Sequence, residues 1–117
     1  MGFIRRSEER TLDVRKMFGG DGEASMLRIL NDPEEMSGKG RVFSHLFLAP
    51  GCEVGWHIHH GDGETYYILR GHGVYSDNGT PVNVGPGDVT YVGDGEGHSL
   101  KNTGTEVLEA IALILYV

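Results

Sequence analysis

Glycine spacing is the feature of this sequence that most restricts how it can fold. Of the 117 residues, 19 are glycine, and they separate short apolar segments instead of gathering in one low-complexity block. Tight turns require glycine more often than other structures do, so this spacing predicts many short segments joined by turns. Such a pattern is typical of an all-β chain and disfavours a helical one.

The apolar runs between these turns predict roughly eight or nine short strands. The clearest is residues 41–49, which are rich in aromatic and aliphatic side chains and are followed by Pro50-Gly51. Asn78-Gly79, between two short β-rich runs, indicates a hairpin. The other strands are expected at 24–30, on both sides of a turn at 61–63, and at 73–75, 82–84, 89–92, 98–102 and 107–116. Short strands at even spacing predict a β-sandwich or a β-barrel.

The chain length fits a single domain with one hydrophobic core. Residues 1–23 are mixed and charged and show no sustained periodicity. We therefore expect them to form an N-terminal arm, followed by a β-domain over residues 24–117. Within this stretch, residues 7–17 are expected to form either a short helical turn or simply part of the arm.

The charge of the chain argues against two classes of partner. It contains 17 acidic and 10 basic residues, which gives a net charge of −7. Nucleic acids and anionic membranes attract basic surfaces, so we expect neither as a partner. The basic residues near the N-terminus alternate with acidic ones and do not change this expectation. The longest apolar tract, residues 110–117, is too short to span a bilayer as a helix.

Cysteine content and the N-terminus indicate where the protein is located. Cys52 is the single cysteine, which excludes an internal disulfide framework and fits a reducing compartment. Residues 1–10 contain no apolar segment of the kind found in a secretory signal. We therefore expect a cytoplasmic protein. The sequence places no base beside Cys52, so it is not expected to act as a nucleophile.

The final predicted strand is apolar on both faces. One face would carry Ile111, Leu113 and Leu115, and the other Ala110, Ala112, Ile114 and Tyr116. A strand of this kind has to be covered on both sides. A second copy of the chain would supply the outer cover, so we expect a homodimer. The alternative is that the N-terminal arm folds over this face.

Three potential metal ligands lie close together in the sequence. His57 and His59 are two residues apart, so in a strand they emerge on the same face. A turn at 61–63 would reverse the chain and bring Glu64 opposite the two imidazoles. Two neutral nitrogens and one carboxylate suit a divalent metal, for which His98 is the expected fourth donor. Asp62 is a rival to Glu64, but Gly-Asp-Gly is ordinary turn chemistry.

The spacing of these residues resembles a known motif. Five residues separate Gly51 from His57, one separates His57 from His59, four separate His59 from Glu64, and six separate Glu64 from Gly71. This pattern is similar at every fixed position to the first motif of the cupin superfamily.

A second pattern further along resembles the second cupin motif. Gly87 is followed by five residues, the triplet 93–95, two residues, His98, three residues and Asn102. One position differs, because the family usually has proline where this chain has Gly93. The segment between the motifs, residues 72–86, is short, as in the compact prokaryotic members of the family. In this order, the two motifs and the segment between them span about half of the chain.

The resemblance implies a single-domain cupin jelly-roll barrel, a double-stranded β-helix with its site inside the mouth. It also implies that His57, His59, Glu64 and His98 bind a divalent transition metal, expected to be iron, manganese, zinc or nickel. Gly93 in place of proline leaves the loop before His98 more freedom to lose on ordering, about 0.4–1 kcal/mol. A softer loop would either weaken metal binding or let the mouth open for a ligand.

Two functions follow from a ligand set of this kind. The first is a metal-dependent enzyme of dioxygenase, isomerase or decarboxylase type that acts on a small polar molecule, because up to two metal positions remain open. The second is a non-catalytic module that binds or senses a sugar or a carboxylate. Turnover distinguishes the two.

Two further residues are candidates for a catalytic role. His45 shares a strand face with Phe43 and Phe47; if that face lines the barrel, His45 is an acid–base candidate, and otherwise it is a satisfied histidine in or near the core. Tyr66 has the same parity as Glu64, so its phenol would enter the cavity and donate to a ligand, or pack in the core. Four other residues are not expected in the chemistry: Trp56 and Tyr91 as packing residues, His60 and His72 as exposed ones.

Overall fold

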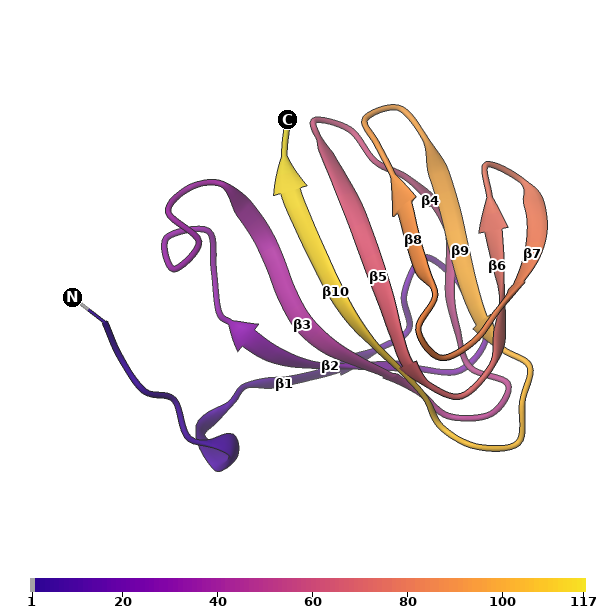
Figure 1. The fold of residues 1–117 in the computed structure, drawn as a ribbon, viewed down its shortest axis with the longest axis horizontal. Coiled ribbons are helices and arrows are strands. Elements are labelled where there is room, and N and C mark those ends of the chain that lie inside the picture. Colours follow the sequence, from indigo (N-terminus) through magenta and orange to yellow (C-terminus); the bar gives the residue numbers. More distant parts are fainter. Residues whose placement is uncertain (1) are drawn as a thin grey trace.

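A computed structural model describes residues 2–117 and shows, within them, ten strands in two antiparallel sheets (Figure 1). The six-stranded sheet has the order β1 (Leu12–Arg15), β2 (Ala24–Leu30), β3 (Gly40–Leu48), β10 (Leu108–Tyr116), β5 (Asp62–Arg70) and β8 (Val89–Val92). The four-stranded sheet has the order β4 (Glu53–Ile58), β9 (Gly97–Asn102), β6 (Gly73–Asp77) and β7 (Thr80–Val84). The predicted all-β jelly-roll fold is confirmed.

The core lies between the two sheets and is built by alternating residues of both. β10 is central in the larger sheet, paired with β3 on one side and β5 on the other. Its inward side chains Ala110, Ala112 and Ile114 are buried. The largest fully buried apolar side chains are Leu46, Leu48, Ile68, Leu100 and Leu108. Because these residues come from strands far apart in the sequence, the core depends on long-range strand register.

The N-terminal segment departs from its predicted structure. The only helical residues within 7–17 are Ser7–Glu9, which form a 3-10 turn, and Leu12–Arg15 form the strand β1. β1 pairs with β2 from Leu12 opposite Leu27 to Arg15 opposite Ala24. Its alternate residues Leu12 and Val14 are more than 45% exposed, so backbone pairing with the free edge of β2 holds the strand rather than burial. The predicted short helical turn is therefore confined to Ser7–Glu9, and the strand that follows it was not predicted.

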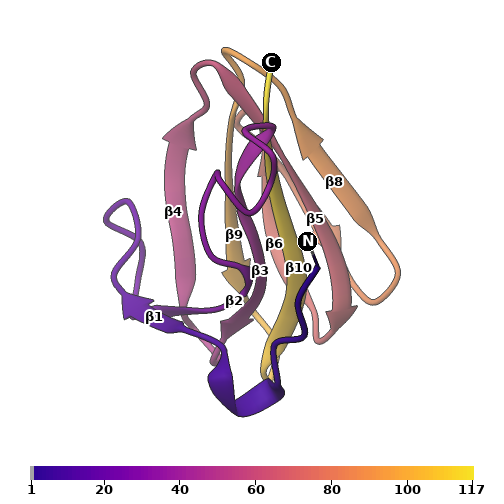
Figure 2. The ribbon, with the colours of Figure 1, turned by 90° about the vertical axis from the view of Figure 1, so that its left-hand side faces the viewer.

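The chain after β1 crosses from one sheet to the other. Met17 forms an isolated parallel bridge with Val54 of β4, and the Gly55 and Glu53 amides donate to the carbonyls of Met17 and Asp21 at 3.0 and 2.8 Å. Figure 2 shows the turn that follows β1 lying beside β4. We call residues 17–21 the crossing segment. It closes one side of the space between the sheets.

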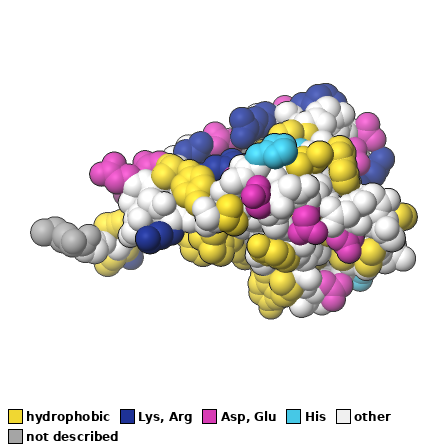
Figure 3. Space-filling view, turned by 90° about the horizontal axis from the view of Figure 1, so that it is seen from above, with side chains coloured by type: hydrophobic (Ala, Val, Ile, Leu, Met, Phe, Trp, Pro, Cys, Tyr) yellow, Lys and Arg dark blue, Asp and Glu magenta, His cyan; other side chains and the backbone are white. Residues whose placement is uncertain are grey.

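The outer face of the larger sheet is only partly covered. Tyr67, Leu69 and Leu115 on this face are 46%, 39% and 47% exposed. The residues before Ser7 do not cover them, because this part of the chain extends away from the barrel and leaves Ile4 75% exposed (Figures 1 and 3). Across residues 2–117, no helix has the length and apolar character needed to cross a bilayer.

Candidate metal centre

Four side chains from both sheets meet at one point between them. His57 lies near the end of β4, His59 follows that strand, Glu64 lies on β5 and His98 on β9. Each contributes one nitrogen or oxygen, and these four atoms all lie within 4.8 Å of one another. The structure thus brings together the four residues that the sequence predicted as ligands.

The distances within this cluster suit neighbouring ligands of one ion. His98 Nε2 lies 3.1 Å from His57 Nε2, 3.2 Å from His59 Nε2 and 3.1 Å from Glu64 Oε1. Glu64 Oε1 lies 3.3 Å from His59 Nε2 and 3.8 Å from His57 Nε2. Adjacent ligands at right angles on an ion with bonds of about 2.0–2.2 Å lie roughly 3 Å apart.

The second nitrogen of each histidine determines which nitrogen faces the cluster. Nδ1 of His57 lies 2.8 Å from the Gly55 carbonyl, Nδ1 of His59 lies 2.7 Å from Asp62 Oδ1, and Nδ1 of His98 lies 2.9 Å from the Tyr75 hydroxyl. With each Nδ1–H donating to these acceptors, three Nε2 lone pairs converge. Converging lone pairs repel one another unless a cation lies between them, so this donor set fits a metal ion.

Asp62 supports the cluster instead of joining it. One oxygen accepts from His59 Nδ1, and the other accepts from Arg41 Nε at 2.7 Å. Burial works to raise the pKa of Asp62, but the hydrogen bonds from Arg41 and His59 outweigh it and lower the pKa. Asp62 therefore stays anionic and orients His59. The sequence indicated only a turn residue at position 62. The contact of Asp62 with Arg41 joins β5 to the start of β3, two strands far apart in the sequence, so no local pattern could indicate it.

Burial and hydrogen bonding set the charge of the cluster. Burial, the largest influence on Glu64, would raise its pKa, but hydrogen bonds from the three histidines together hold that pKa far below the usual range. The hydrogen bond to Glu64 raises the pKa of His59, whereas burial lowers the pKa of His98. The cluster therefore combines an anionic carboxylate with imidazole nitrogens, a donor set that a cation would neutralise.

The loop before His98 is tied to the residues around His59. The Gly95 amide donates to the His59 carbonyl at 2.7 Å, and the His59 amide donates to the Glu96 carbonyl at 2.9 Å. The Gly61 amide donates to Asp94 Oδ1 at 2.7 Å. These bonds hold the backbone on both sides of the cluster in one arrangement, although proline is absent at position 93.

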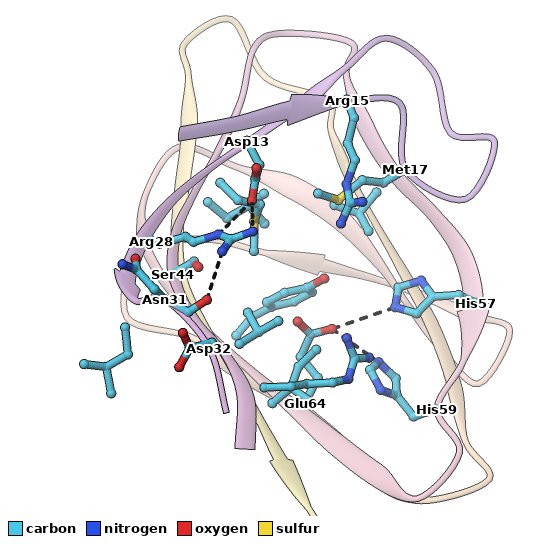
Figure 4. A pocket seen from close by; sticks show the side chains of 18 of the residues that line it. Asp13, Arg15, Met17, Arg28, Asn31, Asp32, Ser44, His57, His59 and Glu64 are labelled. Carbon is cyan, nitrogen blue, oxygen red and sulfur yellow. Dashed lines mark hydrogen bonds and ion pairs between the residues drawn. The ribbon is translucent and has the colours of Figure 1, made fainter. Parts of the chain in front are cut away.

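A cavity of about 200 Å³ opens from the cluster and is lined by both sheets (Figure 4). The metal-ligating candidates His57, His59 and Glu64 line one part of it. The remaining wall comes largely from β1, β2, β3 and the loop at 31–33. A cavity of this size encloses a small ligand and is below the roughly 300–1,000 Å³ typical of drug-sized pockets.

Tyr66 lines this cavity next to the cluster, as its parity predicted. Its side chain is buried, and its ring stacks on His98 with centroids 5.2 Å apart and planes at 8°. Burial, together with the charge of Glu64, raises the pKa of the Tyr66 hydroxyl well above its usual value. The hydroxyl therefore keeps its proton at neutral pH and is available as a donor.

His45 lies outside the cavity, so the condition for its acid–base role, a strand face that lines the barrel, is not met. The cavity is lined by Ser44 and Leu46, the neighbours of His45 on β3. Successive side chains of a strand point to opposite faces, which places His45 on the outer face of the sheet. There its ring stacks on Phe47, and Nε2 lies 2.9 Å from Glu109 Oε1. The sequence did not decide which of the two apolar faces of this strand would turn inward.

Phe18 is a contact of the centre that the sequence reading missed. Its ring stacks on His57 with centroids 3.9 Å apart and planes at 14°. It lies in the crossing segment with a left-handed backbone, φ 53°, and is 61% exposed. The segment has no hydrophobic periodicity, so no local sequence pattern indicated that Phe18 would contact a metal-ligand candidate. Trp56 and Tyr91, expected as packing residues, are 48% and 62% exposed on the outer surface.

Comparisons with known proteins agree with this geometry. The model of the cupin domain family matches residues 44–114. An oxalate-binding protein of Thermotoga maritima is 44% identical over 97% of this chain and 94% of its own length. The crystal structure of a predicted oxalate decarboxylase from Thermotoga maritima superposes with a TM-score of 0.92 at 43% identity, over 98% of this chain and 100% of that one.

A more distant structure shows the fold alone. A polyketide cyclase from Streptomyces resistomycificus superposes with a TM-score of 0.76 at 17% identity, covering 99% of this chain and 80% of that chain. At this identity the likeness extends to the arrangement of strands and not to a ligand.

Proposed function

The chain belongs to the cupin family, and from that premise we propose that it binds oxalate, or a dicarboxylate of similar size, on a divalent transition metal. The observation that carries this proposal is the cluster of three imidazole nitrogens and one carboxylate oxygen at a cavity between the two sheets. The relative from Thermotoga maritima with the name oxalate-binding protein supports the choice of ligand.

The chemistry of the donor set favours a small chelating anion. Four protein donors leave up to two positions on a six-coordinate ion, which suits a ligand with two oxygens. When bound, the ion acts as a Lewis acid that polarises these oxygens. The chain contributes one negative charge to the centre, from Glu64, so a divalent ion leaves the centre positive and attracts an anion. Iron, manganese, zinc and nickel are all compatible with these donors.

Metal analysis combined with calorimetry tests this proposal. We expect the metal-loaded protein to bind oxalate and the chelator-treated protein to lose that binding. A His57→Ala, His98→Ala double variant should lose both metal and oxalate, while His72→Ala, which alters an exposed histidine, should keep both. Equal oxalate binding before and after metal removal would refute the proposal.

Decarboxylation is the second candidate, and Tyr66 favours it. Oxalate dianion plus one proton gives formate and carbon dioxide with no net change in redox state, so a site for this reaction needs a proton donor. The buried, protonated hydroxyl of Tyr66 lines the same cavity as Glu64. Formate production by the metal-loaded protein, lost in Tyr66→Phe with oxalate binding retained, would establish an enzyme. Binding without formate would leave the binding function alone.

A further inference from the structure

One wall of the cavity comes from residues outside the segment that the family model matches. β1, β2 and the loop at 31–33 all precede residue 44. Their side chains lie across the cavity from Glu64 and His59 (Figure 4). These N-terminal residues therefore contact the side of a bound ligand that faces away from the metal ligands.

Three arginines line the cavity, and two of them are occupied. Arg28 is bound to Asp13, with its Nη2 2.7 Å from Asp13 Oδ2, and it also donates to the Asn31 carbonyl at 2.9 Å. Arg41 is bound to Asp62 at 2.7 Å. These two guanidinium groups are neutralised and held by the protein itself, so neither is free to receive an anion.

Arg15 is the third arginine, and it differs from the other two. Figure 4 shows its side chain extending from β1 into the cavity. Among residues 2–117, no carboxylate lies within ion-pair distance of Arg15 and no side-chain hydrogen bond engages it. Its position is set by pairing opposite Ala24 of β2, which directs the odd-numbered residues Asp13 and Arg15 toward the cavity.

The charges around the cavity leave it positive once an ion is bound. The pairs Arg28–Asp13 and Arg41–Asp62 cancel. The remaining lining charges are Glu64, Asp32 and Arg15, which together with a divalent ion sum to one positive unit. The whole chain carries −7, so this cavity is a local exception that attracts anions.

We propose that Arg15 binds the outward-facing oxygens of a dicarboxylate held at the metal centre and thereby selects dicarboxylates over monocarboxylates. This inference rests on the proposed function. A dicarboxylate that chelates an ion through one oxygen of each carboxylate presents its other two oxygens on the far side. The planar guanidinium group donates two parallel N–H bonds, which match two such oxygens. A 2-hydroxy monocarboxylate such as glycolate also chelates through two oxygens but presents a single outward carboxylate oxygen.

Oxalate and glycolate titrations of three variants test the proposal. Arg15→Gln removes both the positive charge and the paired N–H donors of the guanidinium group, whereas Arg15→Lys keeps the charge but not the paired donors. Lys39→Gln is the control, because it makes the same charge change at an exposed residue outside the cavity. Calorimetry on metal-loaded protein would give both affinities, and elemental analysis would give metal content.

We expect Arg15→Gln to weaken oxalate binding by about 10- to 100-fold and glycolate binding much less, with metal content unchanged. Arg15→Lys should fall between Arg15→Gln and the wild type, and Lys39→Gln should match the wild type. An unchanged ratio of the oxalate and glycolate affinities in Arg15→Gln would overturn the role of Arg15 and leave the proposed function standing. Loss of metal in Arg15→Gln would also overturn it, by showing that Arg15 supports the centre itself.

The same titrations separate the two proposals. If the metal-loaded wild type binds neither anion, the proposed function fails, and the role of Arg15 fails with it. If the wild type binds oxalate and glycolate equally, the proposed function stands in part, and selection by Arg15 is refuted.

Discussion

At the scale of single residues, the centre depends as much on what holds the histidines as on the histidines. Each Nδ1 has its own acceptor: a backbone carbonyl for His57, a carboxylate for His59 and a phenol for His98. These acceptors select the tautomer that directs Nε2 inward, and they fix each ring plane. The ligands alone would not have this common direction.

Removal of the Asp62 carboxylate tests this dependence. Asp62→Ala leaves His59 Nδ1 and Arg41 without their acceptor. We expect metal affinity to fall by about 10- to 100-fold, because partners of this kind orient the ligand and raise its basicity. A competition titration against a chelator would measure the change. Glu23→Gln, at an exposed acidic residue, is the control, and equal affinities in both variants would contradict the assigned role.

The metal affinity should depend on pH with a definite sign. The hydrogen bond to Glu64 raises the pKa of His59, so a proton competes for Nε2 at higher pH than at an ordinary histidine. As pH falls through this pKa, we expect affinity to drop by up to about tenfold per pH unit. In the metal-free protein the sign is opposite: stabilisation by protonated His59 is present at low pH and is lost as pH rises through the raised pKa.

Calorimetry in buffers with different ionisation enthalpies would count the protons released on metal binding. Proton release near the pKa of His59 is the expected result. Metal binding that releases no proton and keeps the same affinity between pH 5 and pH 8 would contradict it.

At the scale of elements, the crossing segment connects the two sheets next to the metal centre. Gly20 and Gly55 allow the close approach, because a Cβ on Gly20 would lie 2.6 Å from the Glu53 carbonyl oxygen and 2.7 Å from the Gly55 nitrogen. The same contact places Phe18 on His57. Backbone contact between the N-terminal segment and β4 therefore supports the position of a ligand.

Gly55→Ala tests this contact between elements. The added methyl group would meet the backbone of Phe18 and Gly20, so the crossing segment has to move away from β4. We expect a loss of about 1–3 kcal/mol in the free energy of unfolding, as for other overpacked sites. Chemical denaturation would measure it. Gly104→Ala is the matched control, since its Cβ would meet no atom closer than 3.4 Å, and equal stability of the two variants would refute the interpretation.

At the scale of the whole molecule, the larger sheet presents an apolar outer face. Ile111 of β10 lies between His45 of β3 and Tyr67 of β5, and Leu113 lies between Phe43 and Thr65. Ile111 and Leu113 are half-buried, whereas Tyr67 is 46% exposed. The row continues to the edge strand β8, where Val89 is 66% exposed. An apolar row across neighbouring strands fits a surface that another protein chain covers.

We expect this face to form a homodimer, because an isologous contact covers both copies at once. Leu113→Glu would bury a charge in such a contact and should shift the protein to monomer, as measured by light scattering after size-exclusion chromatography. Thr80→Glu, on an exposed position of β7 in the other sheet, should leave the dimer intact. A wild type that is monomeric at about 100 μM would contradict the prediction, since interfaces of roughly 800 Å² per partner are usually stable there.

The strand content and the donor residues could be predicted from the sequence because both depend on local spacing. Glycines mark the turns, alternation marks the strands, and the separations from Gly51 to Gly71 place two histidines and a glutamate around one hairpin. His98, on the separate strand β9, was a candidate fourth donor only, and the resemblance to the second cupin motif supported it.

Other features depended on contacts between distant segments. The sequence could not assign His45 to the outer face, because both faces of its strand are apolar and a shift of one residue exchanges them. β1 forms along the free edge of β2 without burying its alternate side chains, so propensity alone did not indicate it.

The sequence by itself determined the fold class and the chemistry of the metal centre, because turn residues and ligand spacing act within one or two neighbouring elements. Only the tertiary structure placed Asp62 behind His59, Phe18 on His57 and Arg15 in the cavity. Each of these positions depends on which strands lie side by side and in which register, and that is decided by burial of the whole core rather than by any local stretch of the chain.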